Sequence, residues 1–390
     1  MWIGVEHPGD APARRYHSPM GLRIGDVQLE TNLLLAPIAG YCDLPFRLVV
    51  RSLRGPSGGV GLACTDLLCP QAVLGENEKS LWLAATAPED RPVCMQLYGA
   101  DGDIMAQAAL WAQDHGATTI DINMGCPVDK VTKKNGGSML LCNPAHTADR
   151  LAAKVVRAVR IPVTAKIRLG WDDHSLITRT LPVMLADVGI QAVTVHGRTT
   201  EQRFRGEARW NTAGDDCIRA VVESMARRHP AVPVIGNGDV TDAFRAKAMI
   251  DATGCQGVMI GRGALAQPWV FRDAAHYLRT GELPPPLSRA QKARVVLQHF
   301  DEMVRHRDPR YALIKIKQRI SWYSPQLQPW PHLRRDAQAI RDAAEFREFW
   351  LRGVERIESA DEGDSGAARG EAGNPAVNTL KVEANEAALL

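Results

Sequence analysis

Eight short apolar runs recur through the first 270 residues of the chain, and their spacing constrains the fold more than any other feature. The runs begin at Leu33, Gly61, Val93, Thr119, Val163, Ala192, Val232 and Gly257. Each ends near glycine, proline, asparagine or aspartate, and a stretch compatible with a helix follows it. Successive runs start about 25 to 44 residues apart, which leaves room for a strand, a loop, a helix and a return loop. The pattern predicts an α/β fold, namely a (β/α)8 TIM barrel.

An open, doubly wound parallel sheet is the alternative for the same pattern. No G-x-G-x-x-G motif follows the first run, and its absence weakens this alternative. Ahead of the first run, residues 22–30 (LRIGDVQLE) predict a small hairpin that closes the bottom of the barrel.

The character of the chain changes after the eighth run. A proline-rich break at residues 282–288 is followed by helical periodicity as far as residue 357, which predicts a small C-terminal all-helical domain of three or four helices. Beyond Ser359 the chain has no aromatic residue, and we expect disorder there. We therefore divide the chain into an N-terminal extension (1–21), a catalytic barrel (22–284), a helical domain (285–357) and an acidic tail (358–390).

The net charge of the chain conceals a basic module. The chain carries 47 basic and 44 acidic side chains, a formal charge of +3. Residues 285–357 hold 15 bases and eight acids, which is +7, whereas residues 358–390 hold two bases and seven acids, which is −5. A helical module of this charge suits a phosphate backbone and favours a nucleic-acid partner.

Other features of the sequence bear on location and partners. The first residues lack the apolar core of a signal peptide, and no apolar run approaches the roughly 20 residues that span a bilayer. Eight irregularly spaced cysteines in a chain of this size indicate no disulfide framework, and Cys64 and Cys69 are not spaced as zinc ligands. We expect a cytoplasmic monomer that binds neither a membrane nor a metal.

Polar residues gather at the ends of the predicted strands. Side chains alternate between the lumen and the surrounding helices, so outward-facing Ala165 and Ile167 leave Lys166 and Arg168 pointing inward. The same parity turns further polar side chains inward: Gln96, Asp121, Asn123, Thr194, His196 and Asn237. Active sites of (β/α)8 enzymes lie at this face of the barrel. Internal pairing of Lys166 or Arg168 with Asp121 is the alternative, but so many polar groups at one end favour a ligand.

The last two strands end in loops of the kind that hold a phosphate in this fold. These loops, GNGD at residues 236–239 and IGRGA at residues 260–264, are rich in glycine and offer free backbone N–H groups with one arginine. A phosphate there, with Lys166 and His196 deeper in the lumen, suits flavin mononucleotide (FMN). Lys166 would stabilise the anionic reduced ring, while Gln96 and Asn123 offer it hydrogen bonds.

Cys126 lies in NMGCP, just beyond the fourth predicted strand. A thiol with a pKa near 8.5 is mostly protonated at neutral pH, so it can serve as a general acid without a partner base. No His or Asp stands beside it in sequence, which disfavours a thiolate nucleophile. An inert, half-buried cysteine is the alternative, and it suits five of the other thiols well: Cys42, Cys94, Cys142, Cys217 and Cys255.

Several strings, taken in order, resemble those of the tRNA-dihydrouridine synthases in their bacterial branch. They are LAPIAGYCDLPFR, QLYGAD, DINMGCPVDKV, GGSMLL, AKIRLGW, VHGRT, IGNGD and IGRGAL, and the resemblance covers about residues 22–357. It implies an FMN-binding barrel and a C-terminal helical domain that grips tRNA. It also implies reduction of particular uridines to 5,6-dihydrouridine, with NADPH or NADH as the reductant.

The resemblance also implies roles for individual residues. Reduced flavin would pass a hydride from N5 to C6 of an extruded uracil while Cys126, the family's proton donor, protonates C5. Asn123 and Arg168 are candidates for holding the uracil edge. Lys133 and Lys134 are candidates for nearby phosphates, with a solvated helix start as the alternative. The implied flavin contacts are Pro37, Ile38, Ala39, Gln96, Lys166 and His196, and the implied contacts to the ribityl phosphate arm are Asn237, Gly238, Asp239, Gly261 and Arg262.

Two departures from the family pattern and two rival functions stay open at this point. Ile38 replaces a more usual Met, an apolar exchange that should preserve flavin contacts, whereas Gln318 and Arg319 replace a Lys-His pair and leave RNA contacts there open. The first rival is an FMN-dependent reductase of a small molecule, similar to dihydroorotate dehydrogenase, which needs no basic helical module. The second is an RNA-binding protein without catalysis, against which Cys126, Lys166 and His196 argue.

Overall fold

The computed structural model describes residues 21–364, and within them all eight apolar runs form strands of one closed parallel barrel. The strands are β3 Leu33–Leu35, β4 Leu62–Leu68, β5 Val93–Leu97, β6 Thr119–Met124, β7 Val163–Arg168, β8 Val193–His196, β9 Val234–Asn237 and β10 Gly257–Ile260. Strand β10 pairs with β3 as well as with β9, which closes the barrel. The TIM-barrel prediction is confirmed, and the open-sheet alternative is excluded.

The outer faces of the strands and the surrounding helices share one apolar core. Ile122, Ile167 and Val195 belong to it and are fully buried, as the predicted alternation requires. The principal covering helices are α1 Leu44–Ser52, α4 Gly102–Asp114, α7 Ala153–Ala158, α8 Leu181–Asp187, α9 Ile218–Arg228, α10 Ala243–Thr253 and α12 Val270–Thr280. Shorter helices lie between them: α2 Pro70–Leu74, α3 Glu78–Ala84, α5 Asp129–Thr132, α6 Pro144–His146 and α11 Arg262–Ala266.

A hairpin fills one end of the barrel, as predicted. Strands β1 Leu22–Ile24 and β2 Val27–Leu29 pair antiparallel, with Leu22 opposite Leu29. Their apolar side chains form a small cluster with inward-facing residues of the barrel strands, among them Leu34, Leu62 and Ile235. This end is therefore sealed by side chains, and the opposite end, where the polar residues lie, stays free for a ligand.

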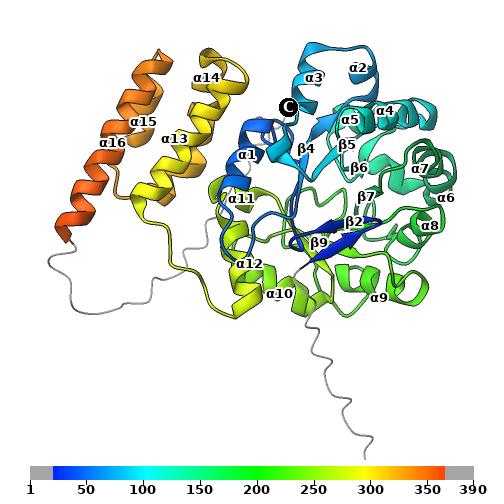
Figure 1. Ribbon diagram of the computed structural model, residues 1–390. Helices are drawn as coiled ribbons and strands as arrows, with labels where there is room; N and C mark the ends of the chain where they lie inside the picture. Colours follow the sequence, from blue (N-terminus) through cyan, green and yellow to red (C-terminus); the bar gives the residue numbers. More distant parts are fainter. Residues whose placement is uncertain (1–20, 365–390) are drawn as a thin grey trace, which may run out of the picture.

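Four helices and a short 3-10 turn follow the proline-rich break, and Figure 1 shows them beside the barrel. They are α13 Arg289–His306, α14 Pro309–Tyr323, α15 Leu333–Ala339 and α16 Ala343–Asp364. Ser288 begins α13 with a capping box, since its hydroxyl accepts from the Gln291 N–H and the Gln291 side chain accepts from the Ser288 N–H. These helices bury an apolar core of their own around Phe300 and Trp350. The predicted C-terminal helical region is confirmed.

The last helix is longer than the periodicity predicted. We expected it to end near residue 357, but α16 continues to Asp364. The added residues are mostly Glu, Ala, Asp and Ser, and the polar face of a helix tolerates such residues without an apolar pattern to reveal them. The rest of the acidic tail and residues 1–20 of the N-terminal extension lie outside the described residues.

Gly353 tests the packing of the helical region. A Cβ at this position in α16 would overlap the ring of Trp330, which itself packs on Trp350 with ring centroids 5.0 Å apart. Alanine gains about 1 kcal/mol over glycine within a helix. Forcing an extra carbon into a packed core costs about 1–3 kcal/mol, and the rigid indole ring has no room to move aside. We expect Gly353→Ala to lower the free energy of unfolding, measured by urea denaturation.

The matched control is Glu355→Ala, an exposed position on the same helix. This change should leave the free energy of unfolding within about 0.5 kcal/mol of the wild type. A Gly353→Ala protein more stable than the wild type would contradict the packing described for Trp330.

Candidate active site

A chain of hydrogen bonds runs through the lumen from Asp121 to the loop that carries Cys126. Gln96 donates from Nε2 to Asp121 Oδ2 over 2.7 Å, and Asn123 donates from Nδ2 to Gln96 Oε1 over 2.8 Å. Asn123 Oδ1 then accepts from the backbone N–H groups of Gly125 (3.2 Å) and Cys126 (2.9 Å). Strands β5 and β6, paired in register with Gln96 opposite Asp121, place the three side chains in line.

The direction of this chain is fixed by its two ends. A carboxylate only accepts and a backbone N–H only donates, so each amide between them has one possible orientation. Asp121 also accepts from the Thr164 hydroxyl at 2.6 Å. Burial raises the pKa of Asp121 to about 6, against the effects of Thr164, Gln96 and Lys166. The buried polar residues are thus satisfied mostly by each other.

The two lumen cations do not neutralise Asp121 through an ion pair, contrary to the internal-pairing alternative. Among the described residues the Lys166 ammonium forms no hydrogen bond or ion pair, although the residue is only partly exposed. Burial, reinforced by the charge of Arg168, lowers the pKa of Lys166 to about 8. A half-buried ammonium without a bonded partner is what a ligand-binding lysine requires.

Arg168 has a different task from Lys166. Its Nε donates to the carbonyl of Gly125 at 2.7 Å, and its Nη1 donates to the carbonyls of Thr199 and Arg203, both at 2.8 Å. Arg168 therefore ties the Cys126 loop to the loop after β8. Its Nη2 makes no hydrogen bond with the residues described here, so one end of the guanidinium stays available to a ligand.

The Cys126 thiol is held in place and kept protonated. Its backbone N–H is bonded to Asn123, and its carbonyl accepts from Ser138 N over 3.1 Å. Gly137 lies against this carbonyl with φ +59°, and a Cβ there would come within 2.7 Å of the oxygen. Burial raises the pKa of Cys126, while Val128 and the charges of Arg168 and Lys166 act in the opposite direction. A positioned, protonated thiol suits proton donation.

Next to this polar chain lies a cluster of cations around His196. Arg198 donates to His196 Nε2 at 3.3 Å, and because a guanidinium cannot accept, the ring proton belongs on Nδ1. Burial, together with Arg168, Lys166, Arg198 and Arg262, holds the pKa of His196 well below its usual range. His196 is thus a neutral imidazole among four positive charges.

Asp239 anchors two of these arginines. Its carboxylate forms a bidentate pair with Arg198 at 2.9 and 2.7 Å, and Arg262 lies 3.5 Å from its Oδ1. Arg198 belongs to the VHGRT string, but its role was not anticipated from the sequence. Asp239 was predicted to hold a phosphate arm directly, and the structure shows its carboxylate occupied by arginines and by Ala208 N (2.7 Å). That predicted contact stays untested.

The turn after β9 needs a glycine. Gly238 has φ +119°, and a Cβ on it would lie 2.7 Å from Ala208 and 3.0 Å from the His196 ring. Asn237 is turned away from this opening, since its amide donates to the Met259 carbonyl at 2.7 Å. The turn at Gly238 and the side chain of Arg262 therefore both adjoin the cluster, and the predicted phosphate contacts stay a prediction.

The loop after β3 lies across the same end of the barrel. A Cβ on Gly261 would approach Ala36 and Ile38 at 3.6 and 3.7 Å, so this loop and the one after β10 are neighbours. Pro37, Ile38 and Ala39 are half-buried. Asp66, which the sequence did not single out, fixes the loop by accepting from Gly40 N at 2.5 Å. Burial raises the pKa of Asp66 to about 6.

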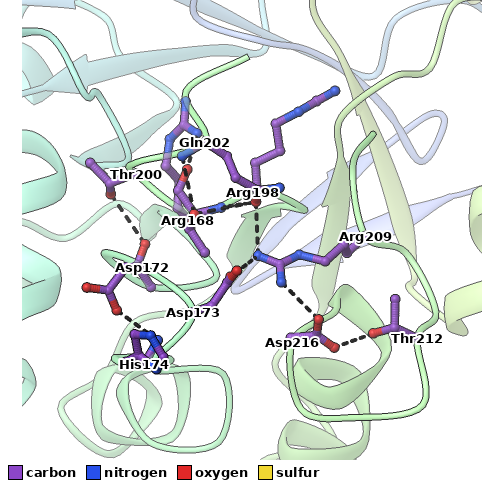
Figure 2. Close-up of polar contacts among 12 residues, drawn as sticks. Arg168, Asp172, Asp173, His174, Arg198, Thr200, Gln202, Arg209, Thr212 and Asp216 are labelled. Carbon is purple, nitrogen blue, oxygen red and sulfur yellow. Dashed lines mark hydrogen bonds and ion pairs between the residues drawn. The ribbon is translucent and has the colours of Figure 1, made fainter. Parts of the chain in front are cut away.

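Two longer loops form the rim, and Figure 2 shows the contacts that join them. Arg209, in the loop after β8, donates to Asp173 (2.7 Å), in the loop after β7, and pairs with Asp216 (2.8 Å). It also donates to the side-chain oxygen Oε1 of Gln202 at 2.9 Å. These contacts position the loop that receives Arg168, so the rim and the Cys126 loop form one connected structure.

Lys133 and Lys134 lie apart from the cluster. They follow α5 and are exposed, and Lys133 is 79% exposed with Asp129 at 3.7 Å. They therefore stand at the end of a short helix rather than at its start, on the surface near the Cys126 loop. The described residues contain no group of three or more His, Cys, Asp or Glu side chains that could hold a metal. Nor do they include a helix long and apolar enough to cross a membrane.

Comparison with known proteins identifies the family. The family model described as dihydrouridine synthase matches residues 34–359. The chain belongs to this family. The tRNA-dihydrouridine synthase B proteins of Escherichia coli K12 and Proteus vulgaris are each 39% identical to this chain over 324 residues, which is 83% of it and 96% and 95% of those proteins. A probable tRNA-dihydrouridine synthase of Rickettsia typhi is 36% identical over 78% of the chain and 89% of its own length.

The family resemblance predicted from the sequence is thereby confirmed. Among solved structures, morphinone reductase in complex with tetrahydroNAD matches 68% of this chain and 92% of its own length, with a TM-score of 0.43 and 14% identity. That similarity is too distant to carry information about function.

Asn123 offers a test of the hydrogen-bond chain. Asn123→Ala removes the acceptor for two backbone N–H groups of the Cys126 loop, at a cost of about 1–3 kcal/mol. A freed loop exposes the thiol and relieves the burial that raises its pKa. We expect iodoacetamide to alkylate Cys126 roughly ten times faster than in the wild type. The rate is measured by mass spectrometry of the peptide that contains Cys126.

Cys142 is exposed and serves as the internal reference for alkylation. Asn77→Ala is the control variant, because Asn77 is an exposed asparagine that caps α3 and takes no part in this hydrogen-bond chain. An Asn123→Ala protein whose Cys126 reacts at the wild-type rate would show that the chain does not position the thiol.

Proposed function

We propose that this protein is a flavin-dependent tRNA-dihydrouridine synthase that reduces the C5=C6 bond of specific tRNA uridines with FMN as cofactor and NADPH or NADH as reductant. One observation carries the proposal: the protonated thiol of Cys126 is held beside the unpaired ammonium of Lys166 at the open end of a barrel of this family. The names of the relatives, tRNA-dihydrouridine synthase B, supply the substrate.

The charges at this site fit an anionic cofactor. Lys166, Arg168, Arg198 and Arg262 all act on His196, whereas the carboxylates nearby are Asp121 and Asp239. Four cations against two anions leave an excess of positive charge that a phosphate would balance. Gly238 has φ +119°, a backbone conformation suited to glycine, and its turn adjoins His196 within this cluster of cations.

We assign the cofactor-binding roles as follows. Residues 37–39 and Gln96 would contact a flavin ring, with Lys166 beside its electron-rich edge and neutral His196 able to donate from Nδ1. Arg262 and the backbone of residues 237–239 and 261 would hold the phosphate arm. When bound, the flavin supplies the hydride that reduces C6 of the uracil.

The residues of the chain supply the proton and hold the base. The S–H bond of Cys126 breaks as a C–H bond forms at C5 of the uracil. Arg168 and Lys166, whose charges lower the pKa of Cys126, stabilise the thiolate that remains until solvent returns its proton. The second amide hydrogen of Asn123 and Nη2 of Arg168 are free to donate to the uracil carbonyls.

The helical region favours tRNA over a small substrate. Its +7 charge lies on helices beside the barrel, of which α14 contacts the loop after β3, and a small-molecule reductase would need no such module. Lys133 and Lys134 stay candidates for phosphate contacts, because both are exposed near the Cys126 loop. We further propose that the protein acts as a cytoplasmic monomer.

Nucleoside analysis tests the proposed function. Purified protein is incubated with NADPH and unmodified tRNA, the tRNA is digested, and dihydrouridine is measured by mass spectrometry. We expect dihydrouridine in tRNA and none from free uridine or orotate. Absence of product from every tRNA, with flavin bound, would overturn the proposal, and reduction of a small pyrimidine instead would favour the rival reductase.

Cys126→Ala separates cofactor binding from proton donation. Within the described residues the thiol donates no hydrogen bond, and the bonds that hold this loop run through its backbone. The variant should therefore keep its flavin. Loss of a positioned general acid costs about 10²–10⁴-fold in rate. We expect dihydrouridine formation to fall by this factor, with the visible flavin spectrum retained.

Cys142→Ala is the matched control, because Cys142 is an exposed cysteine outside the hydrogen-bond chain and its removal should leave the rate unchanged. Full activity of Cys126→Ala would refute the assignment of the proton donor.

A further inference from the structure

A buried ion pair joins the helical region to the barrel. Arg319, in α14, donates from Nη2 to Asp43 Oδ2 at 2.9 Å, and the two side chains are 4% and 2% exposed. Tyr311, also in α14, donates to the same oxygen at 3.2 Å. The other oxygen of Asp43 caps α1 by accepting from Phe46 N at 3.1 Å. One barrel carboxylate thus receives two side chains of the helical region.

Arg319 is further enclosed by aromatic and imidazole groups. Its Nη1 bonds to His299 Nε2, which must be the acceptor, so the His299 Nδ1 proton points to the Tyr323 hydroxyl at 2.8 Å. Burial and the charge of Arg319 hold the pKa of His299 well below its usual range. The guanidinium therefore keeps a single neutralising partner, Asp43, and its position is determined from several sides.

The barrel side of this contact belongs to the active-site loop. Asp43 follows residues 37–39, the proposed flavin contacts, by only a few positions. Arg319 Nη2 also donates to the Tyr41 carbonyl at 3.3 Å, and its guanidinium lies 5.7 Å from the Tyr41 ring centroid. Tyr41 in turn packs edge-on against Trp322 of α14. The helical region is therefore fastened to the loop that borders the reactive site.

The same contacts exclude Arg319 as a residue that binds RNA. Gln318 and Arg319 replace a Lys-His pair in the family pattern, and RNA contacts at both positions were left open by the sequence. Arg319 is buried with its charge paired, so a phosphate of bound RNA has no access to it. Gln318 is exposed and stays a candidate for such a contact.

We propose that Asp43 and Arg319 form a rigid joint that orients the helical region on the barrel and thereby determines which uridine of a bound tRNA reaches Cys126. This inference rests on the proposed function. When a tRNA is bound by the helical region, each base lies at a fixed distance from the bound segment. A small misplacement of the reacting groups lowers the rate of reaction strongly. A buried ion pair tolerates little misalignment, which is the property such a joint requires. Both residues are positioning residues, since neither contacts the reacting atoms.

Asp43→Asn is the test variant, because asparagine still caps α1 while its amide no longer neutralises Arg319. Without tRNA, flavin reduction by NADPH should stay within about twofold of the wild type, since the barrel site is intact. With tRNA, kcat/KM should fall at least about tenfold and dihydrouridine should spread to neighbouring uridines. Wild-type kcat/KM and an unchanged modified position in a folded variant would overturn the proposal.

Asp301→Asn is the matched control. Asp301 pairs with Arg347 across α13 and α16, inside the helical region, and both side chains are exposed. This change removes a carboxylate of the same type without touching the barrel, and it should alter neither rate nor position. A loss equal to that of Asp43→Asn would show that any weakening of the helical region has this effect, and would overturn the joint.

A milder variant decides the matter if Asp43→Asn does not fold. Tyr311→Phe removes one hydrogen bond to Asp43 and keeps the ring packed on Trp82, with centroids 4.9 Å apart. We expect kcat/KM with tRNA to fall roughly threefold and the rate of flavin reduction without tRNA to stay the same. An unchanged kcat/KM with tRNA would overturn the proposal.

Hydrogen exchange separates failure of the joint from failure of the proposed function. Tyr311→Phe or Asp43→Asn should speed amide exchange in α14 and in residues 41–43, which its side chains contact, but not in α7 on the opposite side of the barrel, whatever the substrate is. If the wild type forms no dihydrouridine, the proposed function fails and this exchange pattern alone decides whether the joint exists. Unchanged exchange in both segments would overturn it.

Discussion

Asp121 is a buried carboxylate without a bonded cation, and the arrangement of the reactive end of the barrel depends on how it is satisfied. It accepts from two neutral donors, Gln96 and Thr164, and the first of these must then find its own partner. That requirement passes through Asn123 to the backbone of the Cys126 loop. The hydrogen bonds that satisfy buried Asp121 therefore also fix the position of the Cys126 loop.

The cations of the site fall into two groups, according to whether protein groups already occupy their hydrogen-bond donors. Arg168 and Arg198 are occupied by carbonyls and by Asp239, so their main effect is to hold loops and to keep His196 neutral. Lys166 and Arg262 keep more freedom, and their charge is what a bound anion would meet. In this way the protein's own groups compensate part of the positive charge of the site, and the rest is left to interact with a bound anion.

The sequence was sufficient for the barrel, because period-two alternation and regular spacing report directly on strands that are buried on both faces. It also located Cys126, since the NMGCP string stands at a strand end where this fold keeps its chemistry. It did not reveal the partners that arise from the fold: Arg198 meets Asp239 across 41 residues, and Arg319 meets Asp43 across 276. No local pattern encodes such distant pairs. For the same reason, spacing indicated that Arg168 points inward but not that backbone carbonyls occupy most of its donors.

A single-turnover experiment tests the central claim, that this end of the barrel passes a hydride to tRNA uracil while Cys126 supplies the proton. The protein is reduced with one equivalent of NADPH without oxygen and mixed with unmodified tRNA, and flavin absorbance and dihydrouridine are followed together. The account predicts that flavin is reoxidised as dihydrouridine forms, one for one, and that Cys126→Ala slows both by the same factor. Reoxidation without dihydrouridine, or equal rates in the two proteins, would contradict it.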